Sequence, residues 1–377
     1  MDIKQFIKEN EQGMYDLLKD LCLIPAPSGK EDARAAFCKN WFEQIGAKGV
    51  YIDEAKNVIF PLNAEGSNAL TVYVAHTDTV FPDEEPMPYS DDGEIVRCPG
   101  VGDDTASLVV MMYLAKYYVE NNIAPENGIL FVANSCEEGL GNLKGTRKLF
   151  EDFAGRVKQF VSYDSHINRI DDRCVGSHRY EVEVQTKGGH SYTAFGNKNA
   201  IAALADMIHD IYAIEMPVRE GSRVTLNVGI VEGGTSVNTI AQSAKMLCEY
   251  RSDNAECIDI MKEKFFEIFE KAKTDEVKVI VTNVGERPCA RGVNEDDLRA
   301  LVAECAAVIT EVDGREPTCV SGSTDCNIPL SLGVPAICIG VYYGGGAHTR
   351  EEWVEKKSMV PGLEIAIKVA AKLNKNI

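Results

Sequence analysis

The chain has 377 residues, of which 45% are hydrophobic, and a formal net charge of −19. This length favours two domains over one, and the negative charge argues against binding to nucleic acid or to an anionic membrane surface. No apolar run reaches the roughly 20 residues of a membrane-spanning helix, and residues 1–8 lack the apolar segment of a signal peptide. The twelve cysteines lack zinc-finger or disulfide-framework spacing, which predicts reduced thiols in a cytoplasmic protein.

The first half of the chain has the pattern of an α/β domain. Helices are predicted over residues 14–24 and 28–46, and the second begins with Ser28 and Glu31 at the spacing of a capping box. Strand and helix signals then alternate up to about residue 165, with a helix over 109–119. This alternation is typical of a mainly parallel sheet flanked by helices.

The pattern changes after about residue 175. Residues 180–185 alternate in polarity, as in an antiparallel strand with one solvated face. The elements that follow give the order β-α-β-β-α-β of a ferredoxin-like unit, with further helices and strands over residues 200–212, 224–231, 244–250, 255–272 and 277–281. From about 287 the α/β pattern returns. The sequence therefore predicts a larger domain of residues 1–175 and 287–377, with an inserted α+β domain of residues 176–286.

Ionisable residues follow the buried strands of the larger domain. They are His76 and Asp78 after residues 70–75, Glu137 and Glu138 after residues 129–133, and Asp164 after residues 160–161. The carboxyl ends of parallel strands meet at one edge of a sheet, where ligands bind. Asp103 lies in a glycine-rich turn at a helix start, and His348 follows three glycines. Imidazole and carboxylate groups together suit divalent ions such as zinc, manganese or cobalt.

Several readings of these motifs remain open from the residues alone. A single His-x-Asp or Glu-Glu pair is usually a solvated surface feature, and only the repetition at strand ends indicates a site. Asp78 is a candidate to orient His76 through the second ring nitrogen. Because Glu137 and Glu138 are adjacent, one carboxylate can bind metal while the other faces a substrate. His166 is an alternative ligand to Asp164, since residues two apart in an extended segment share a face.

Taken in order, the motifs resemble those of the co-catalytic di-zinc metallopeptidases. This family includes peptidase T, the carnosine-type dipeptidases, the aminoacylases and succinyl-diaminopimelate desuccinylase, and the chain resembles the peptidase T-like branch most. The resemblance extends from residues 24–31 to His348 and includes Gly188-Gly189-His190-Ser191. It implies two divalent ions, zinc first and manganese or cobalt as alternatives. One ion would be held by His76, Asp103 and Asp164, and the other by Asp103, Glu138 and His348.

The resemblance also implies roles for other residues. Asp103 would bridge the ions, Asp78 would orient His76, and Glu137 would act as general base and then acid. The inserted domain would serve as a lid and as the surface of a homodimer. Substrate would contact residues of both domains, namely His190, Asn238, Arg251 and Ser323. The family further places a cis peptide bond after the bridging aspartate, here between Asp103 and Asp104.

Two departures from the family pattern bear on the reaction. Thr105 stands where the family turn often has lysine, and Asp164 stands where some relatives carry glutamate. As the resemblance goes, aspartate at this position is typical of aminopeptidases and dipeptidases. It therefore implies hydrolysis of the N-terminal bond of short peptides. An N-acyl amino acid amidohydrolase with the same metals is the alternative, and a non-catalytic binding module is disfavoured because every inferred ligand and Glu137 are present.

Overall fold

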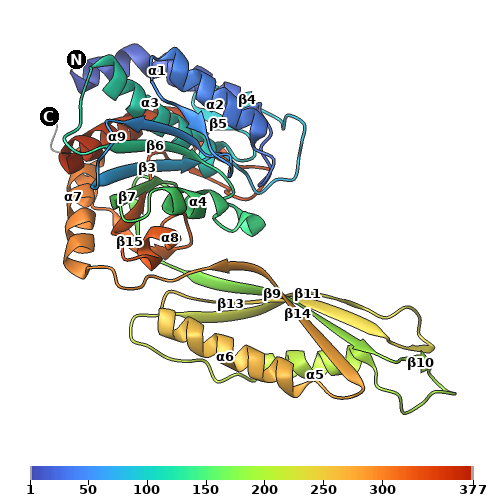
Figure 1. The fold of residues 1–377 in the computed structure, drawn as a ribbon. Coiled ribbons are helices and arrows are strands. Elements are labelled where there is room, and N and C mark those ends of the chain that lie inside the picture. The colour runs from blue at the N-terminus through green and yellow to red at the C-terminus, as the bar shows by residue number, and fades with distance from the viewer. Residues whose placement is uncertain (1, 375–377) are drawn as a thin grey trace. The chain divides into compact units, whose positions relative to one another are not determined.

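The computed structural model describes residues 2–374, which form two compact units (Figure 1). The first unit contains the residues up to Cys174 together with those from Arg291 onward, and the second contains Val175–Ala290. None of the helices in the described residues is long and apolar enough to cross a membrane.

The first unit is built on an eight-stranded sheet with the order β1-β2-β6-β3-β7-β16-β8-β15. Its four central neighbours, β6, β3, β7 and β16, run parallel to one another. The strands are β1 (Tyr51–Ile52), β2 (Val58–Leu62), β3 (Leu70–His76), β6 (Ile129–Asn134), β7 (Val157–Tyr163), β8 (Arg169–Cys174), β15 (Thr318–Gly322) and β16 (Ala336–Ile339). The parallel strands are continuous apolar runs because both faces of the sheet are covered.

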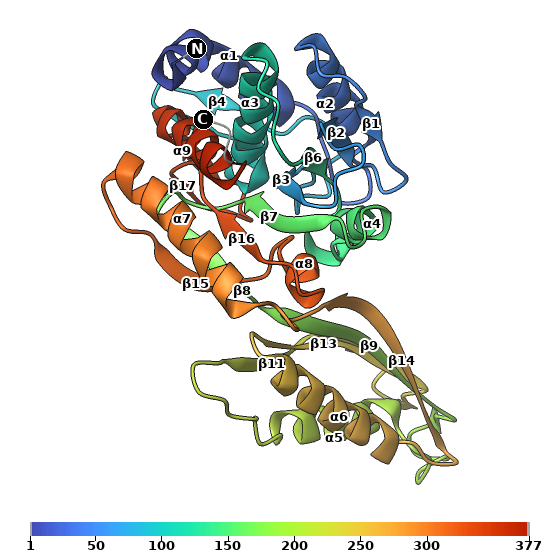
Figure 2. The ribbon, with the colours of Figure 1, turned by 60° about the vertical axis from the view of Figure 1, so that its left-hand side comes forward.

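Helices cover the two faces of this sheet (Figures 1 and 2). Side chains of β3 alternate between the two cores, with Tyr73 in one and Val72 and Val74 in the other. The first core includes α1 (Ile3–Cys22), α2 (Asp32–Gln44), α3 (Ser107–Glu120), α7 (Glu295–Asp313) and α9 (Met359–Asn374), and the second includes α4 (Lys144–Asp152) and α8 (Asn327–Ser331). The predicted α/β class, a sheet with parallel strands flanked by helices, is confirmed.

A small four-stranded sheet joins two distant segments of the first unit. It consists of β17 (Gly344–Gly345), β18 (Trp353–Glu355), β5 (Ile95–Arg97) and β4 (Ser90–Asp91). Trp353 pairs with Arg97, so the loop between β17 and β18 lies beside the turn that follows β5. That turn continues into the short π-helical segment η1 (Val101–Ala106) and then into α3.

The second unit is an antiparallel sheet with the strand order β11-β13-β9-β14. Two helices pack on it, and together the elements follow the predicted β-α-β-β-α-β order. They are β9 (Gly176–Thr186), α5 (Ala200–Tyr212), β11 (Val224–Gly233), β13 (Ser243–Ser252), α6 (Ala255–Lys271) and β14 (Val277–Arg287), with β10 (Gly189–His190) and β12 (Thr239–Ile240) as a separate pair. The ferredoxin-like prediction for the inserted segment is confirmed.

The predicted capping box is wrong. Helix α2 begins at Asp32, and its first turn has no side-chain cap. The hydroxyl of Ser28 instead donates to Oδ2 of Asp78 at 2.6 Å. The carboxylate of Glu31 accepts the backbone N–H groups of Gly29 and Cys136 at 2.7 and 3.1 Å. Ser28 and Glu31 therefore each bond to a residue distant in sequence, Asp78 and Cys136 respectively, close to the ionisable strand ends.

Candidate metal centre

The predicted metal ligands and the predicted base, Glu137, come from five segments of the first unit. His76 is the last residue of β3, Glu137 and Glu138 follow β6, and Asp164 follows β7. Asp103 lies in η1 and His348 lies between β17 and β18. Because β3, β6 and β7 are parallel neighbours, their carboxyl ends meet at one edge of the sheet.

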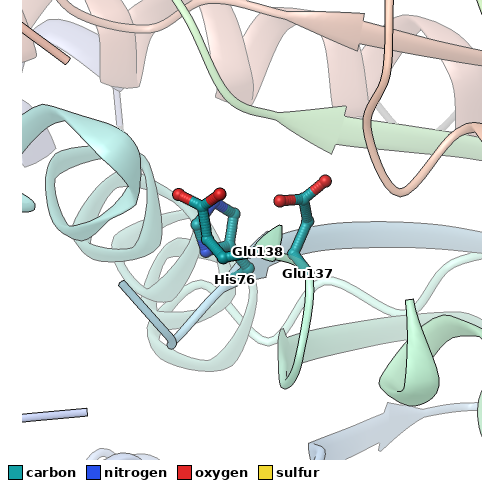
Figure 3. A group of neighbouring side chains, drawn as sticks. All are labelled: His76, Glu137 and Glu138. Carbon is teal, nitrogen blue, oxygen red and sulfur yellow. The ribbon is translucent and has the colours of Figure 1, made fainter. Parts of the chain in front are cut away.

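Three groups of these side chains have ligand atoms within 4.8 Å of one another. They are His76 with Asp103 and Asp164, Asp103 with Glu138 and His348, and His76 with Glu137 and Glu138. Figure 3 shows the third group, with the carboxylate of Glu138 in front of the His76 ring and that of Glu137 standing to one side. Asp103 is common to the first two groups and absent from the third.

Asp103 lies between the two imidazoles. Its Oδ1 is 3.0 Å from Nε2 of His76, and its Oδ2 is 3.1 Å from Nε2 of His348. Each carboxylate oxygen thus faces a different histidine, the arrangement that a bridging ligand requires. The peptide bond between Asp103 and Asp104 is cis, as the family resemblance implies.

The donor set fits divalent cations. Oε1 of Glu138 is buried and has no hydrogen-bond partner among residues 2–374; Nε2 of His348 is 3.3 Å away but lies outside hydrogen-bond geometry. A buried carboxylate oxygen without a donor is costly unless a cation neutralises it. Oxygen and nitrogen ligands without thiolate are compatible with zinc, manganese or cobalt.

Asp78 holds the backbone that carries the glutamate pair. Its two carboxylate oxygens accept the N–H groups of Glu137 and Glu138, each at 2.9 Å. Nδ1 of His76 is 3.0 Å from the backbone carbonyl of Asp78 and 3.5 Å from its carboxylate. His76 thus contacts both the carbonyl and the carboxylate of Asp78, and the same carboxylate holds the Glu137–Glu138 segment.

Sequence analysis missed Glu352, which holds the turn that bears Asp103. Its carboxylate is 2% exposed and accepts three backbone N–H groups, from Gly100 at 2.6 Å, Gly102 at 2.9 Å and Asp103 at 2.7 Å. A Cβ atom on Gly102 would lie 3.0 Å from Oε1 of Glu352, so the close approach requires glycine. Nothing in the local sequence distinguishes Glu352 from a solvated acidic residue.

The substitution Glu352→Gln should destabilise the protein by about 1–3 kcal/mol. The amide NH₂ of glutamine would face a backbone N–H and cannot accept a hydrogen bond from it. Denaturant unfolding of the metal-free protein measures this change. Glu355→Gln, an exposed neighbour on β18, is the matched control and should have little effect. Equal unfolding midpoints for the two variants would contradict the role of Glu352 in holding this turn.

Protonation of the cluster follows from burial and from its mutual charges. Burial, reinforced by Asp103, raises the pKa of Glu138 to about 7. Close contact with Asp103, and then with Glu138, raises the pKa of His348 to about 10. Burial opposes ionisation of Asp103, yet the two imidazoles keep the pKa of this carboxyl well below its usual range. Protons therefore occupy the ligand atoms, and a cation must displace these protons in order to bind.

Metal binding should weaken as the pH falls. Glu138 and His348 have raised pKa values, so the metal-free form retains protons below about pH 7 and about pH 10 respectively. Ion binding releases these protons, and the apparent affinity must rise with pH. Calorimetric titration in buffers of different ionisation enthalpy should show about one proton more released at pH 6 than at pH 8. A proton count that does not change with pH would contradict this assignment.

The predicted substrate residues are divided between the two units. Ser323 is half-buried in the loop between β15 and α8 of the first unit. His190 and Asn238 are exposed neighbours in the second unit, where the N–H of Ser191 donates to the Asn238 carbonyl at 2.9 Å. Arg251 pairs with Ser177 at the opposite end of β9 and forms an ion pair with Glu249 at 2.8 Å. Within the second unit, Arg251 therefore does not lie beside His190 and Asn238.

His166, the alternative ligand, does not belong to any of the three groups in the described residues. Its ring packs edge-on against Tyr342, with 5.5 Å between the ring centroids. Burial lowers the pKa of His166. Asp164 is thus the residue of this segment that the fold brings to His76 and Asp103.

The chain is similar to curated proteins at low sequence identity. The chain is 24% identical over 387 residues to the YqjE protein of Bacillus subtilis, covering 96% of this chain and 98% of that protein. It is 25% identical over 275 residues to acetylornithine deacetylase of Myxococcus xanthus, covering 68% and 67% of the two chains.

Solved structures share the fold along the whole chain. A tripeptidase from Staphylococcus aureus superposes with a TM-score of 0.78 at 22% identity, covering 96% of this chain and 99% of the other. The aminopeptidase PepT from Bacillus cereus gives a TM-score of 0.73 at 22% identity, covering 96% and 98%. The profile of peptidase family M20/M25/M40 matches residues 72–372, which is most of the chain. The chain therefore belongs to peptidase family M20/M25/M40 and is a hydrolase.

Proposed function

We propose that this protein is a metal-dependent exopeptidase that removes the N-terminal residue from short peptides, chiefly di- and tripeptides. Two divalent ions, zinc first and manganese or cobalt as alternatives, would be bound by His76, Asp103, Asp164, Glu138 and His348. The observation that carries this proposal is the position of Asp103, which presents one oxygen to each histidine and is common to two ligand groups. Glu137 belongs to a third group, with His76 and Glu138, that does not include Asp103.

The chemistry divides between the ions and the chain. Bound ions would act as Lewis acids and lower the pKa of water toward roughly 7. Glu137 would take a proton from the attacking water and pass it to the departing amine. The N–H bonds from Glu137 and Glu138 to Asp78 keep the base and the adjacent ligand in a fixed relation. Such positioning contributes to rate because the reacting groups need no reorganisation.

The inserted domain would supply most of the remaining substrate contacts, and Ser323 of the first unit would add one more. His190 would stabilise the tetrahedral oxyanion, and Asn238, Arg251 and Ser323 would contact the peptide. Arginine suits recognition of a substrate carboxylate. The second unit, which carries three of these residues, would also form the homodimer surface. The similarity to a tripeptidase and to aminopeptidase PepT supports a peptide substrate with a free amino terminus.

An N-acyl amino acid amidohydrolase is the second candidate. The chain's similarity to acetylornithine deacetylase favours it, since that protein's name describes removal of an acyl group from an amino acid. Both reactions break an amide bond and could use the same ligands and the same base. The presence of an aspartate, Asp164, in place of the glutamate of some relatives favours the exopeptidase.

Hydrolysis of one tripeptide and of its N-acetylated twin, after loading with metal, separates the candidates. We expect cleavage of the free peptide at its first bond and no cleavage of the twin. Release of acetate from the twin would instead assign the protein to the amidohydrolases. If two ions bind and neither compound is cleaved, the exopeptidase proposal is wrong for these substrates and a binding role gains support.

A further inference from the structure

The guanidinium of Arg34 is buried and contacts two segments that carry proposed metal ligands. Arg34 lies in the first turn of α2 and is 2% exposed. Its five hydrogen bonds all go to uncharged oxygen atoms. Burying a cation among uncharged partners is costly, so the position is not explained by packing alone.

The bonds of Arg34 reach three separate segments. Nε and Nη2 donate to carbonyls at the end of α1, with Nη2 at 2.8 Å from both Leu21 and Ile24. Nη1 donates to the carbonyl of Thr77 at 2.9 Å and to the hydroxyl of Thr105 at 3.4 Å. A guanidinium carries five N–H donors in a rigid plane, and here all five are used.

Thr77 and Thr105 each lie next to proposed ligands. Thr77 is between His76 and Asp78, and its N–H and hydroxyl both donate to the carbonyl of Asn134 at 2.7 Å. The hydroxyl of Thr105, two residues after Asp103, donates to the carbonyl of Gly100 at 2.6 Å. Nη1 of Arg34 therefore joins the backbone after β3 to the turn η1.

We propose that Arg34 is a positioning residue that holds His76 and Asp103 in register for a shared ion, by joining the two segments that carry them. This inference rests on the proposed two-metal function. Partners of metal ligands typically change metal affinity by about 10–100-fold when they are removed. The planar fork, and not the charge alone, is required, because a lysine ammonium is a point charge that cannot reach three segments at once.

Arg34→Lys in the full-length protein tests this role. The rate of zinc transfer to a chelator should rise about 10–100-fold, and the absorption spectrum of the cobalt-saturated protein should change. Arg156→Lys is the matched control. Arg156 also donates to two carbonyls, of Ser67 at 2.9 Å and Ala64 at 2.7 Å, but it precedes β7 at the opposite edge of the sheet. This control should leave both readouts at wild-type values.

Thr105 provides a second test if Arg34→Lys does not fold. Thr105→Val removes one of the two acceptors of Nη1, whereas Thr105→Ser keeps the hydroxyl. We expect faster metal release from the valine variant only and, where Arg34→Lys folds, non-additive effects when the two substitutions are combined. Equal release from the valine and serine variants, or additive effects in the combination, would overturn the role of Arg34.

The wild-type measurement separates this inference from the proposed function. A wild-type protein that binds no ions under these conditions would overturn both. Two bound ions with wild-type release and spectrum in Arg34→Lys would overturn the positioning role and leave the two-metal proposal intact. Altered release from Arg34→Lys and from Arg156→Lys alike would show a general effect of stability and would also reject the positioning role.

Discussion

Replacement of Glu137 by glutamine is expected to lower the turnover number by roughly 10²–10⁴-fold while both ions remain bound. The amide has nearly the shape of the carboxylate but cannot accept the proton of the attacking water. Glu137 is held at the Asp78 carboxylate by its backbone N–H and not by its side chain. The segment that carries Glu138 should therefore keep its position.

Two measurements on the same preparation are needed for this test, because one group of ligand atoms contains Glu137 together with His76 and Glu138. Metal content after dialysis tells whether Glu137 is a ligand, and the rate of tripeptide hydrolysis at saturating substrate tells whether it is the base. Glu138→Gln is the neighbouring contrast and should lose metal. If Glu137→Gln loses an ion as well, Glu137 belongs to the ligand set; near wild-type turnover would remove it from catalysis.

The strand ends that form the candidate site were predictable from sequence because a continuous apolar run changes to polar residues where each strand ends. A strand buried on both faces, such as β3, must be a continuous apolar run, so the change to polar residues at His76 indicates where the strand ends. Parallel topology then places that end beside the end of β6. Period-two alternation in β9 similarly identified an antiparallel sheet with one buried face, whose pattern of burial the structure shows.

The residues that hold these ligands in place were not predictable by the same means. Glu352 accepts N–H groups about 250 positions earlier in the chain, and its partners are backbone atoms with no side-chain pattern. Arg34 donates mostly to carbonyls, which every residue possesses. A local pattern can also mislead. Ser28 and Glu31 match a capping box, but Asp78 and the Cys136 N–H lie close enough to bind them instead. Tertiary partners override local propensity where an alternative bond is available.

Replacement of Asp103 by alanine is expected to release both ions and to abolish hydrolysis. Each of its oxygens faces a different histidine, so its loss leaves His76 with Asp164 on one side and His348 with Glu138 on the other. Two ligands bind a divalent ion much more weakly than three. Elemental analysis after dialysis should therefore find neither ion at near-stoichiometric occupancy.

Asp92→Ala is the matched control for this substitution. Asp92 is another aspartate in a turn, where its carboxylate accepts the N–H groups of Glu94 at 3.0 Å and Ile95 at 2.8 Å, but it is exposed and belongs to none of the ligand groups of the described residues. Loss of only one ion from Asp103→Ala would mean that the second ion has a ligand set of its own. In that case the facing histidines would be neighbours without a bridge, and Asp103 would serve one ion only. Loss of both ions, with full retention by Asp92→Ala, requires a ligand common to the two sites.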